Sequence, residues 1–172
     1  MSHIIWLTGI SGSGKTTIAE ALKKRFELKG KKSYVLDGDK IRDFFEGDLG
    51  YKREQRIQNV KRVALLAKIL AENEVVAIVA NMAPYYEVRD FLRRKLKNYV
   101  QVYLKASTEK CAQRDVKGHY AKALSGEMEN MVGVDDQYDV PRTPDLILDT
   151  DTETVEESTG RLVEYLVSIG VV

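Results

Sequence analysis

Residues 9–16 read Gly-Ile-Ser-Gly-Ser-Gly-Lys-Thr, a spacing of residue types that can bind the phosphates of a nucleotide. The segment meets every fixed position of the phosphate-binding pattern G-x-x-x-x-G-K-[ST] and directly follows the apolar run at 4–7. Glycines permit a backbone path on which several N–H groups point into one concavity without Cβ atoms in the way. The pattern therefore predicts a loop that binds a nucleoside triphosphate.

The side chains of this loop are expected to bind different parts of a magnesium-bound triphosphate. Lys15 can reach the β- and γ-phosphates, the Thr16 hydroxyl can ligate Mg²⁺, and the helix that begins there adds the positive end of its dipole. We expect ATP contacts from Gly9, Ser11, Gly12, Ser13, Gly14, Lys15, Thr16 and Thr17. The alternative is a glycine-rich turn that matches by chance, but an apolar run before the loop and an apolar helical face after it argue against that.

Two carboxylates stand at the end of the second apolar run, in Leu36-Asp37-Gly38-Asp39. In an α/β sheet the carboxyl ends of the strands form the ligand crevice. Asp39 could accept a hydrogen bond from a substrate hydroxyl, or hold Mg²⁺ waters, in front of the phosphate that Lys15 binds. The run at 75–80 continues into Asn81 rather than an acidic residue, so Asp37 and Asp39 must supply the negative charge. A strand-ending turn with a helix cap is a second interpretation, and both can hold.

Apolar runs that alternate with helical patterns are expected to position these groups. The runs lie at 4–7, 34–36, 75–80, 100–104 and 146–148. Val60, Val63, Ala64, Ala67 and Leu70 form the best of the helical patterns, and a final helix is expected over about 154–168. The alternation predicts the α/β class, with a doubly wound, parallel, five-stranded sheet of the P-loop kinase type and residues 1–172 in one domain.

A polar segment at 115–144 interrupts this pattern. It carries Gly118, Gly126 and Gly133, and Pro141 and Pro144 lie near its end. A phosphoryl-transfer enzyme must exclude water from the γ-phosphate, so we interpret the segment as a mobile lid. An ordinary long surface loop is the alternative.

Composition excludes several other classes of function. The chain has 172 residues, 44% of them hydrophobic, and 27 Lys plus Arg balance 26 Asp plus Glu to a net charge of +1, so no nucleic acid polymer is expected as a partner. We interpret the densest basic stretch, 89–97, as a solvated helix face. The longest strongly apolar run is too short to span a bilayer, and the single Cys111 suits a reducing compartment, so no membrane partner and a cytoplasmic location are expected.

Beyond the P-loop, the chain resembles the adenylylsulfate (APS) kinases over nearly its whole length. These enzymes transfer the ATP γ-phosphate to the 3′-hydroxyl of adenosine 5′-phosphosulfate, giving 3′-phosphoadenylylsulfate and ADP. The resemblance rests on an ordered set of motifs. They are Leu36-Asp37-Gly38-Asp39 with Ile41-Arg42, Asp48-Leu49-Gly50-Tyr51, Arg56-x-x-Asn59-Val60-x-Arg62, Pro84-Tyr85 with Arg89-Asp90, Cys111-x-x-Arg114-Asp115-x-Lys117-Gly118-x-Tyr120, Gly133-Val134-Asp135, Tyr138-x-x-Pro141 and Leu148-Asp149-Thr150.

The resemblance implies a role for each matching position. Lys15, Asp39 and Lys117 would be catalytic, with Asp39 by the reacting hydroxyl and Lys117 closing over the phosphates from the lid. Arg114 would lie against the adenine of ATP. The implied acceptor contacts are Asp37, Asp39, Arg42, Tyr51, Arg56, Asn59, Lys117 and Met131. Mg²⁺ as cofactor, with Thr16 as its ligand, and a homodimer are implied as well.

Departures from the family pattern bear on the acceptor. Tyr51 and Met131 stand where the family has the two phenylalanines that sandwich the acceptor's adenine, and Ala83 replaces a serine, which excludes a phosphoserine intermediate there. A relative that phosphorylates another nucleotide, such as cytidine diphosphoramidate, is therefore a second hypothesis. A third is a regulatory module that binds ATP without turnover, against which the retention of Lys15 and Asp39 argues.

Overall fold

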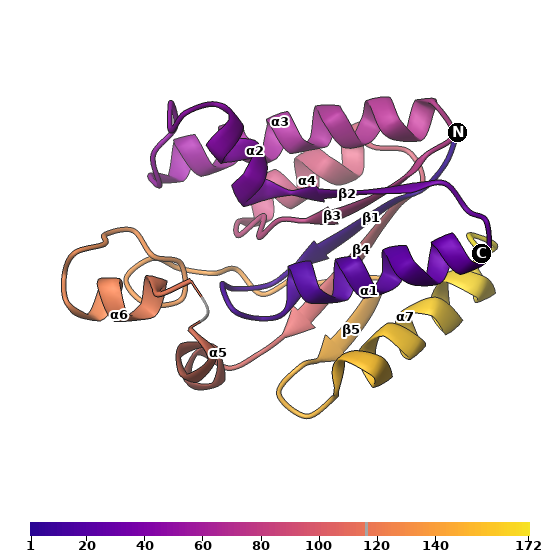
Figure 1. Ribbon diagram of the computed structural model, residues 1–172. Helices are drawn as coiled ribbons and strands as arrows, with labels where there is room; N and C mark the ends of the chain where they lie inside the picture. The colour runs from indigo at the N-terminus through magenta and orange to yellow at the C-terminus, as the bar shows by residue number, and fades with distance from the viewer. Residues whose placement is uncertain (116) are drawn as a thin grey trace.

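The computed structural model describes residues 1–115 and 117–172 and has at its centre a five-stranded parallel sheet in the order β2-β3-β1-β4-β5 (Figure 1). The strands are β1 (Ile4–Thr8), β2 (Ser33–Asp37), β3 (Val76–Ala80), β4 (Tyr99–Lys105) and β5 (Leu146–Asp149). Every strand coincides with a predicted apolar run to within two residues at each end. The predicted doubly wound α/β fold is confirmed.

Seven helices surround this sheet within the described residues. They are α1 (Lys15–Leu28), α2 (Gly38–Phe44), α3 (Arg53–Glu72), α4 (Tyr86–Lys95), α5 (Thr108–Arg114), α6 (His119–Leu124) and α7 (Val155–Ser168). Helices α1 and α7 cover one face of the sheet, and α3 and α4 cover the other (Figure 1). The predicted final helix is α7, which begins with a capping box made by Thr154 and Glu157.

The central strand β1 supplies both hydrophobic cores, because successive side chains of a strand point to opposite faces. Ile5 and Leu7 pack toward α1 and α7, whereas Ile4 and Trp6 pack toward α3 and α4. All five residues of β1 are buried. This burial explains why the strand reads as a continuous apolar run, and it fixes the starting point of the loop that follows.

The segment predicted as a lid is attached to the body by a third hydrophobic cluster. Ile10 of the P-loop, Cys111 of α5, Tyr120 of α6 and Met131 make up this cluster. The Tyr120 hydroxyl also donates to the Ser11 carbonyl, with 2.7 Å between the oxygens. Residue 116, which belongs to the predicted lid, lies outside the described residues. Whether the lid moves stays a prediction.

The C-terminal part of the same segment is bonded to α4 and its N-terminal loop. Tyr85 donates to Asp136 (2.6 Å), and the Asp139 carboxylate accepts from the Tyr86 N–H (2.9 Å). Arg89 donates to the Asp139 carbonyl and is 4% exposed. The interpretation of 89–97 as a solvated face is therefore wrong for Arg89, because its guanidinium lies between two backbone segments, although the remaining cations of that stretch are exposed.

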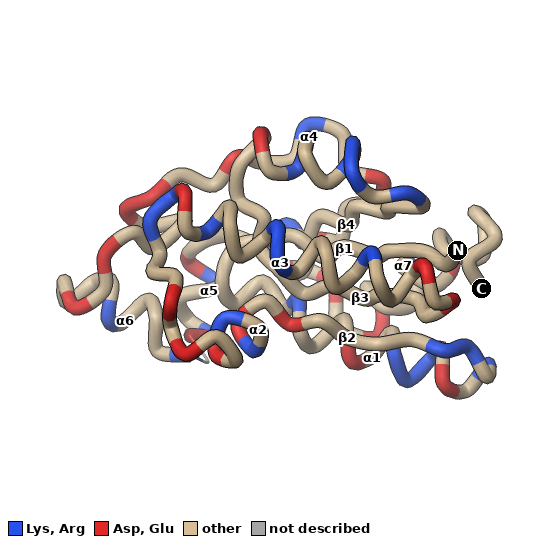
Figure 2. The backbone as a smooth tube through the Cα atoms, turned by 90° about the horizontal axis from the view of Figure 1, so that it is seen from above, with Lys and Arg blue, Asp and Glu red and all other residues tan. Residues whose placement is uncertain are grey.

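Charges of both signs are distributed over most of the elements (Figure 2), in keeping with the net charge of +1. None of the described helices combines the length and the apolar character that crossing a membrane requires.

Substitution of a buried residue on α1 tests which face of this helix packs on the sheet. Phe26 is fully buried against the sheet, so Phe26→Ala should lower the free energy of unfolding by about 3–5 kcal/mol through lost burial and the cavity left behind. Chemical denaturation measures it. The matched control is Leu28→Ala on the same helix, where the side chain is 83% exposed and the change should stay within about 0.5 kcal/mol. Equal losses in the two variants would contradict the assigned face of α1.

Candidate active site

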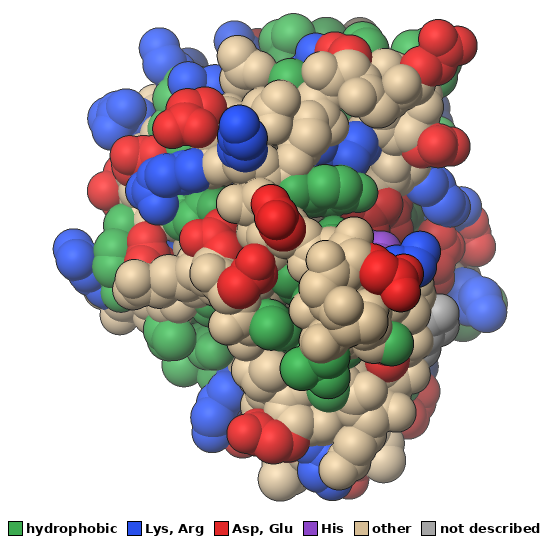
Figure 3. Space-filling view, turned by 90° about the vertical axis from the view of Figure 1, so that its left-hand side faces the viewer, with side chains coloured by type: hydrophobic (Ala, Val, Ile, Leu, Met, Phe, Trp, Pro, Cys, Tyr) green, Lys and Arg blue, Asp and Glu red, His purple; other side chains and the backbone are tan. Residues whose placement is uncertain are grey.

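A cavity of about 510 Å³ opens at the carboxyl edge of the sheet, between the P-loop, α2, α3 and the 115–144 segment. Figure 3 shows the end of the molecule at which these elements meet, with side chains of both charges around apolar ones. Of the predicted site residues, the cavity wall includes Ser11, Gly12, Ser13, Gly14, Lys15, Thr16, Thr17, Asp37, Asp39, Arg42, Tyr51, Arg56, Asn59, Arg114, Lys117 and Met131. Gly9 lies beneath the loop instead, behind the lining residues.

The position of Gly9 explains why the loop needs a glycine there. A Cβ atom at this position would lie 2.6 Å from the Ser13 hydroxyl and 2.7 Å from the Leu104 carbonyl oxygen, closer than packed atoms approach. The first glycine therefore lets the loop fold down onto β4. Gly9 thus shapes the loop but is not among the residues that line the cavity.

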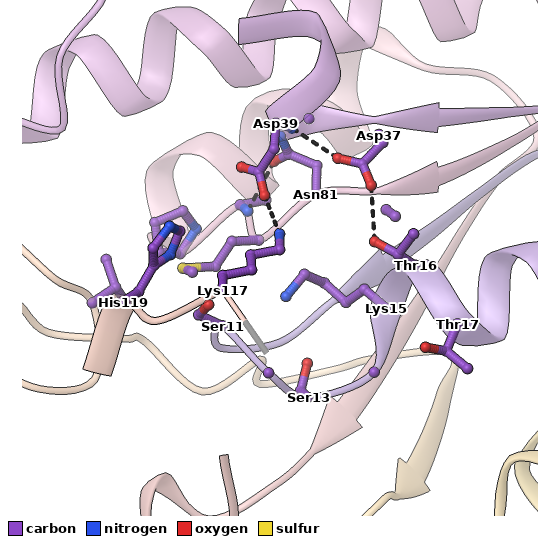
Figure 4. Close-up of a pocket in the computed structure, with 18 of the residues that line it drawn as sticks. Ser11, Ser13, Lys15, Thr16, Thr17, Asp37, Asp39, Asn81, Lys117 and His119 are labelled. Carbon is purple, nitrogen blue, oxygen red and sulfur yellow. Dashed lines mark hydrogen bonds and ion pairs between the residues drawn. The ribbon is translucent and has the colours of Figure 1, made fainter. Parts of the chain in front are cut away.

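The Lys15 ammonium is held by the loop itself. It donates to the carbonyl oxygens of Gly9 (2.8 Å) and Ile10 (2.7 Å). Figure 4 shows the Lys15 side chain in the cavity, between Thr16 and Lys117. Burial lowers the pKa of Lys15 to about 8, although the nearby Asp39 carboxylate acts in the opposite direction. The cation thus lies in surroundings that lack sufficient negative charge, which an anionic ligand would supply.

Asp37 connects the P-loop to α2 through its two carboxylate oxygens. One accepts from the Thr16 hydroxyl (2.8 Å), and the other accepts from the Asp39 N–H (2.9 Å) and so caps α2 (Figure 4). The two interpretations of Leu36-Asp37-Gly38-Asp39, as a source of charge and as a helix cap, hold together. With its proton directed to Asp37, the Thr16 oxygen keeps lone pairs for another ligand.

This pair of hard oxygen donors fits Mg²⁺. The ion prefers oxygen ligands and usually takes one or two from protein and the rest from phosphates and water. Among the residues that the structure describes, no group of three or more His, Cys, Asp or Glu side chains is arranged to bind a metal alone. Thr16 and Asp37 would thus hold Mg²⁺ together with a phosphorylated ligand.

Asp39 and Lys117 form an ion pair across the cavity, between α2 and the 115–144 segment (Figure 4). Burial of the Asp39 carboxyl acts to raise its pKa, but the bond to Lys117 and the charges of Lys15 and His119 outweigh burial and hold that pKa below its usual range. The same bond outweighs the burial of Lys117 and raises the pKa of its ammonium. Both groups are therefore charged at neutral pH.

Two guanidinium groups lie close to the aromatic ring of Tyr51. The Arg42 guanidinium carbon is 4.7 Å from the ring centroid and that of Arg56 is 5.1 Å away. Arg42 donates to the carbonyls of Leu49 and Gly50, both at 2.7 Å, and Arg56 donates to the carbonyls of Tyr51 (2.8 Å) and Asn130 (2.6 Å). Hydrogen bonds and cation–π contacts thus fix the loop that carries Tyr51.

Asn59 and Met131 complete this side of the wall, and each is 3% exposed. Asn59 donates to the Gly38 carbonyl (3.2 Å), which leaves its own buried carbonyl oxygen without a hydrogen-bond partner within the described residues. Such an unpaired acceptor is costly unless a ligand or water satisfies it. Met131 contributes an apolar surface.

Arg114 lies at the opposite end of the cavity and connects two backbone segments. It donates to the carbonyls of Gly12 (3.2 Å) and Thr150 (2.5 Å), while the Thr150 hydroxyl donates to the Ser13 carbonyl (3.0 Å). The segment after β5 is thereby joined to the P-loop. Its neighbours Glu153, Thr154, Val155 and Ser158 line the same end.

Several wall residues were not predicted from the sequence, among them Asn81 and His119. The signal for Asn81 was its place directly after β3, at the ligand edge of the sheet. The side-chain amide of Asn81 packs against Gly38 so closely that a Cβ atom on Gly38 would lie 2.0 Å from the amide nitrogen. The backbone carbonyl of Asn81 accepts from the buried Trp6 indole (2.9 Å). The signal for His119 was its spacing of two residues from Lys117.

Comparison with known proteins assigns the chain to a family. The sequence model of the family described as adenylylsulphate kinase matches residues 1–149. An adenylyl-sulfate kinase from Halothermothrix orenii is 42% identical over 162 residues, which cover 94% of this chain and 88% of the relative, and one from Staphylococcus carnosus is 40% identical over 167 residues, with coverages of 96% and 84%.

Solved structures agree with the sequence relatives. A Mycobacterium tuberculosis APS kinase in complex with AMPPNP and APS superimposes with a TM-score of 0.92 at 32% identity, covering 96% of this chain and 97% of that one. A hexameric APS kinase from Thiobacillus denitrificans matches with a TM-score of 0.74 at 26% identity, covering all of this chain and 30% of that one. The chain belongs to the adenylylsulphate kinase family, whose members are ATP-dependent phosphotransferases.

Proposed function

We propose that the protein transfers the γ-phosphate of ATP to the 3′-hydroxyl of adenosine 5′-phosphosulfate, with Mg²⁺ as cofactor. The observation that carries this proposal is a single cavity in which the P-loop cation Lys15 faces the carboxylate of Asp39. A phosphate donor on the loop and an alcohol acceptor beside Asp39 would meet between these two groups. The Mycobacterium tuberculosis relative, solved with AMPPNP and APS, supports the choice of both substrates.

The donor half of the site neutralises phosphate charge. Lys15 would exchange its two carbonyl partners for β- and γ-phosphate oxygens, which the backbone N–H groups of the loop would also bind. Mg²⁺, held by Thr16 and Asp37, would supply further charge neutralisation there. Arg114 and the segment after β5 would surround the adenine.

Lys117 would change partners when ATP binds. In the structure its ammonium is paired with Asp39, and triphosphate oxygens would compete for it. The carboxylate of Asp39 would then be free to accept the proton of the acceptor hydroxyl. The hydroxyl oxygen forms a bond to the γ-phosphorus, the bond from that phosphorus to the β,γ-bridging oxygen breaks, and ADP leaves.

The acceptor half would bind a nucleotide that carries two negative charges next to its sugar. Guanidinium groups suit such a linkage, and those of Arg42 and Arg56 lie close to Tyr51, whose ring would stack on the base. The unpaired carbonyl oxygen of Asn59 would accept a hydrogen bond from a sugar hydroxyl. Met131 would pack on the second face of the base through its thioether.

Met131 also favours a second candidate acceptor, a pyrimidine nucleotide such as cytidine diphosphoramidate. A flexible thioether provides one aromatic face fewer than a stacked pair, which suits a smaller base. An acceptor screen with ATP and Mg²⁺, followed by mass measurement of the products, distinguishes the two. It also tests the third hypothesis, a regulatory module, for which ATP would bind without ADP release under any acceptor.

We also propose, from the family resemblance, a homodimer in the cytoplasm. Light scattering on the purified protein tests the first part. A monomer, or a hexamer like that of the Thiobacillus denitrificans relative, would contradict it.

Asp39→Asn tests the acceptor-side role. The change keeps the shape of the side chain but removes the charge that receives the hydroxyl proton, so turnover should fall by about 10² to 10⁴ while ATP affinity is largely retained. Steady-state kinetics and ATP titration provide the measurement. Asp90→Asn, an exposed site on α4, is the control and should behave as the wild type. A loss confined to ATP binding would place Asp39 in the donor half instead.

The lowered pKa of Lys15 predicts proton uptake on nucleotide binding. Above pH 8 part of the free protein carries neutral Lys15, whereas phosphate binding requires the cation, so binding ATP at pH 9 should take up a fraction of a proton. At pH 7 most of the lysine is already charged, so its contribution should be small. Calorimetry in buffers of different ionisation enthalpy measures the uptake. Lys15→Met removes the group, and undiminished uptake in this variant would assign the proton elsewhere.

Met131→Phe tests the identity of the acceptor. If APS is the acceptor, a second stacked ring should lower its apparent constant by up to about tenfold, since an aromatic contact contributes roughly 0.5 to 1.5 kcal/mol, and the ATP constant should not change. With a pyrimidine acceptor the added ring should crowd the pocket. No gain for APS, together with efficient wild-type turnover of a pyrimidine nucleotide, would favour the second candidate.

A further inference from the structure

The cavity continues outward into a second space of about 440 Å³, between α2 and the start of α6, which we call the outer lobe. Its wall consists of Asp37, Asp39, Lys40, Arg42, Asp43, Gly47, Tyr51, Lys117 and His119. His119 lines both the outer lobe and the main cavity. Figure 4 shows the imidazole of His119 on the same side of the cavity as Lys117.

The backbone around His119 is fixed by its neighbours. The Asp115 carboxylate accepts from the N–H groups of Tyr120 (3.1 Å) and Ala121 (3.0 Å), and the Tyr120 side chain is buried against the P-loop. Since Tyr120 is turned inward, the preceding residue is directed along the cavity wall. His119 is therefore positioned by the same bonds that attach α6 to the P-loop.

Charges in the outer lobe balance without His119. Among the described residues of its wall, Asp37, Asp39 and Asp43 provide three carboxylates, and Lys40, Arg42 and Lys117 provide three cations. With Asp37 on Mg²⁺ and Lys117 on the triphosphate, as proposed above, two carboxylates and two cations of the wall remain, so the balance is kept. A lobe with equal numbers of both signs has no net attraction for an anion. The charge of one histidine then decides whether the lobe is neutral or positive.

We propose that His119 is an acceptor-binding residue, whose protonated imidazole provides the net positive charge that holds the anionic group of the acceptor in the outer lobe. The inference rests on the proposed function, because an acceptor with a phosphosulfate or similar group beside its sugar would extend from Asp39 toward this lobe. An imidazolium loses its charge when it is deprotonated, so acceptor affinity should fall as pH rises.

Charged groups of both signs face the imidazole of His119. On its own segment these are Asp115 and Lys117, and across the lobe they are the charged residues of α2 together with Tyr51. The charge of His119 contributes to the lowered pKa of Asp39, so the two groups are electrostatically coupled. A phosphosulfate keeps its charge over this pH range, so the acceptor itself adds no pH dependence.

The test measures the apparent constant for APS between pH 5.5 and 8.5, at saturating ATP and Mg²⁺. In the wild type it should rise by about three- to tenfold, the size of one partly screened charge contact. His119→Gln should give a high constant that does not change with pH, and His119→Lys a low one that does not change with pH. Turnover at saturating acceptor and the ATP constant should differ little among the three proteins.

Lys122→Gln is the matched control, because Lys122 lies on the same helix, is exposed and is absent from the cavity wall. It should reproduce the wild-type profile. Persistence of the wild-type pH rise in His119→Gln would overturn the inference, as would a change confined to turnover. If the Lys122 variant also lost the rise, the pH dependence would come from the overall charge of α6. That result would likewise overturn the inference.

A binding measurement separates this inference from the proposed function. APS is titrated by calorimetry into each protein with AMPPNP and Mg²⁺ present, at pH 6 and at pH 8. Binding that weakens with pH in the wild type but not in His119→Gln supports the role of His119 even if no product forms, and in that case only the proposed reaction fails. Turnover of APS with identical binding in both proteins would leave the reaction intact and refute the role of His119.

Discussion

The hydrogen bonds of the Asp37 carboxylate are the constraint on which the site depends. One oxygen holds the hydroxyl of the P-loop threonine and the other caps α2, so the phosphate loop and the helix that carries Asp39 cannot shift independently. Asp37 itself is fixed at the end of β2, which pairs with β3. The pairing of β2 with β3 thereby fixes the relative positions of Thr16 and Asp39.

The sheet and the P-loop could be predicted from the sequence because both depend on local pattern. Buried parallel strands read as continuous apolar runs, and the loop depends on glycines at fixed spacing, of which Gly9 has a demonstrable steric reason. The burial of Arg89 could not be predicted, because its guanidinium is bonded to the backbone carbonyl of Asp139, which is 50 residues away in the sequence. Helical periodicity carries no information about such a partner.

The same limit applies to the 115–144 segment. It is polar in sequence, yet Tyr120 and Met131 join Ile10 and Cys111 in a cluster whose members are scattered along the chain. Each apolar residue alone gives no periodic signal, so the segment reads as a loop. His119 was missed for a related reason, since only folding brings it into one cavity wall with the charged residues of α2.

The bond from Trp6 to Asn81 has a consequence for observing this protein. Trp6 is the single tryptophan of the chain, is fully buried in β1 and donates to the carbonyl of a residue that lines the cavity. An indole in such a place is an intrinsic fluorophore that is shielded from solvent and hydrogen-bonded to a residue of the cavity wall. Its emission therefore reports on the carboxyl edge of the sheet without any added label.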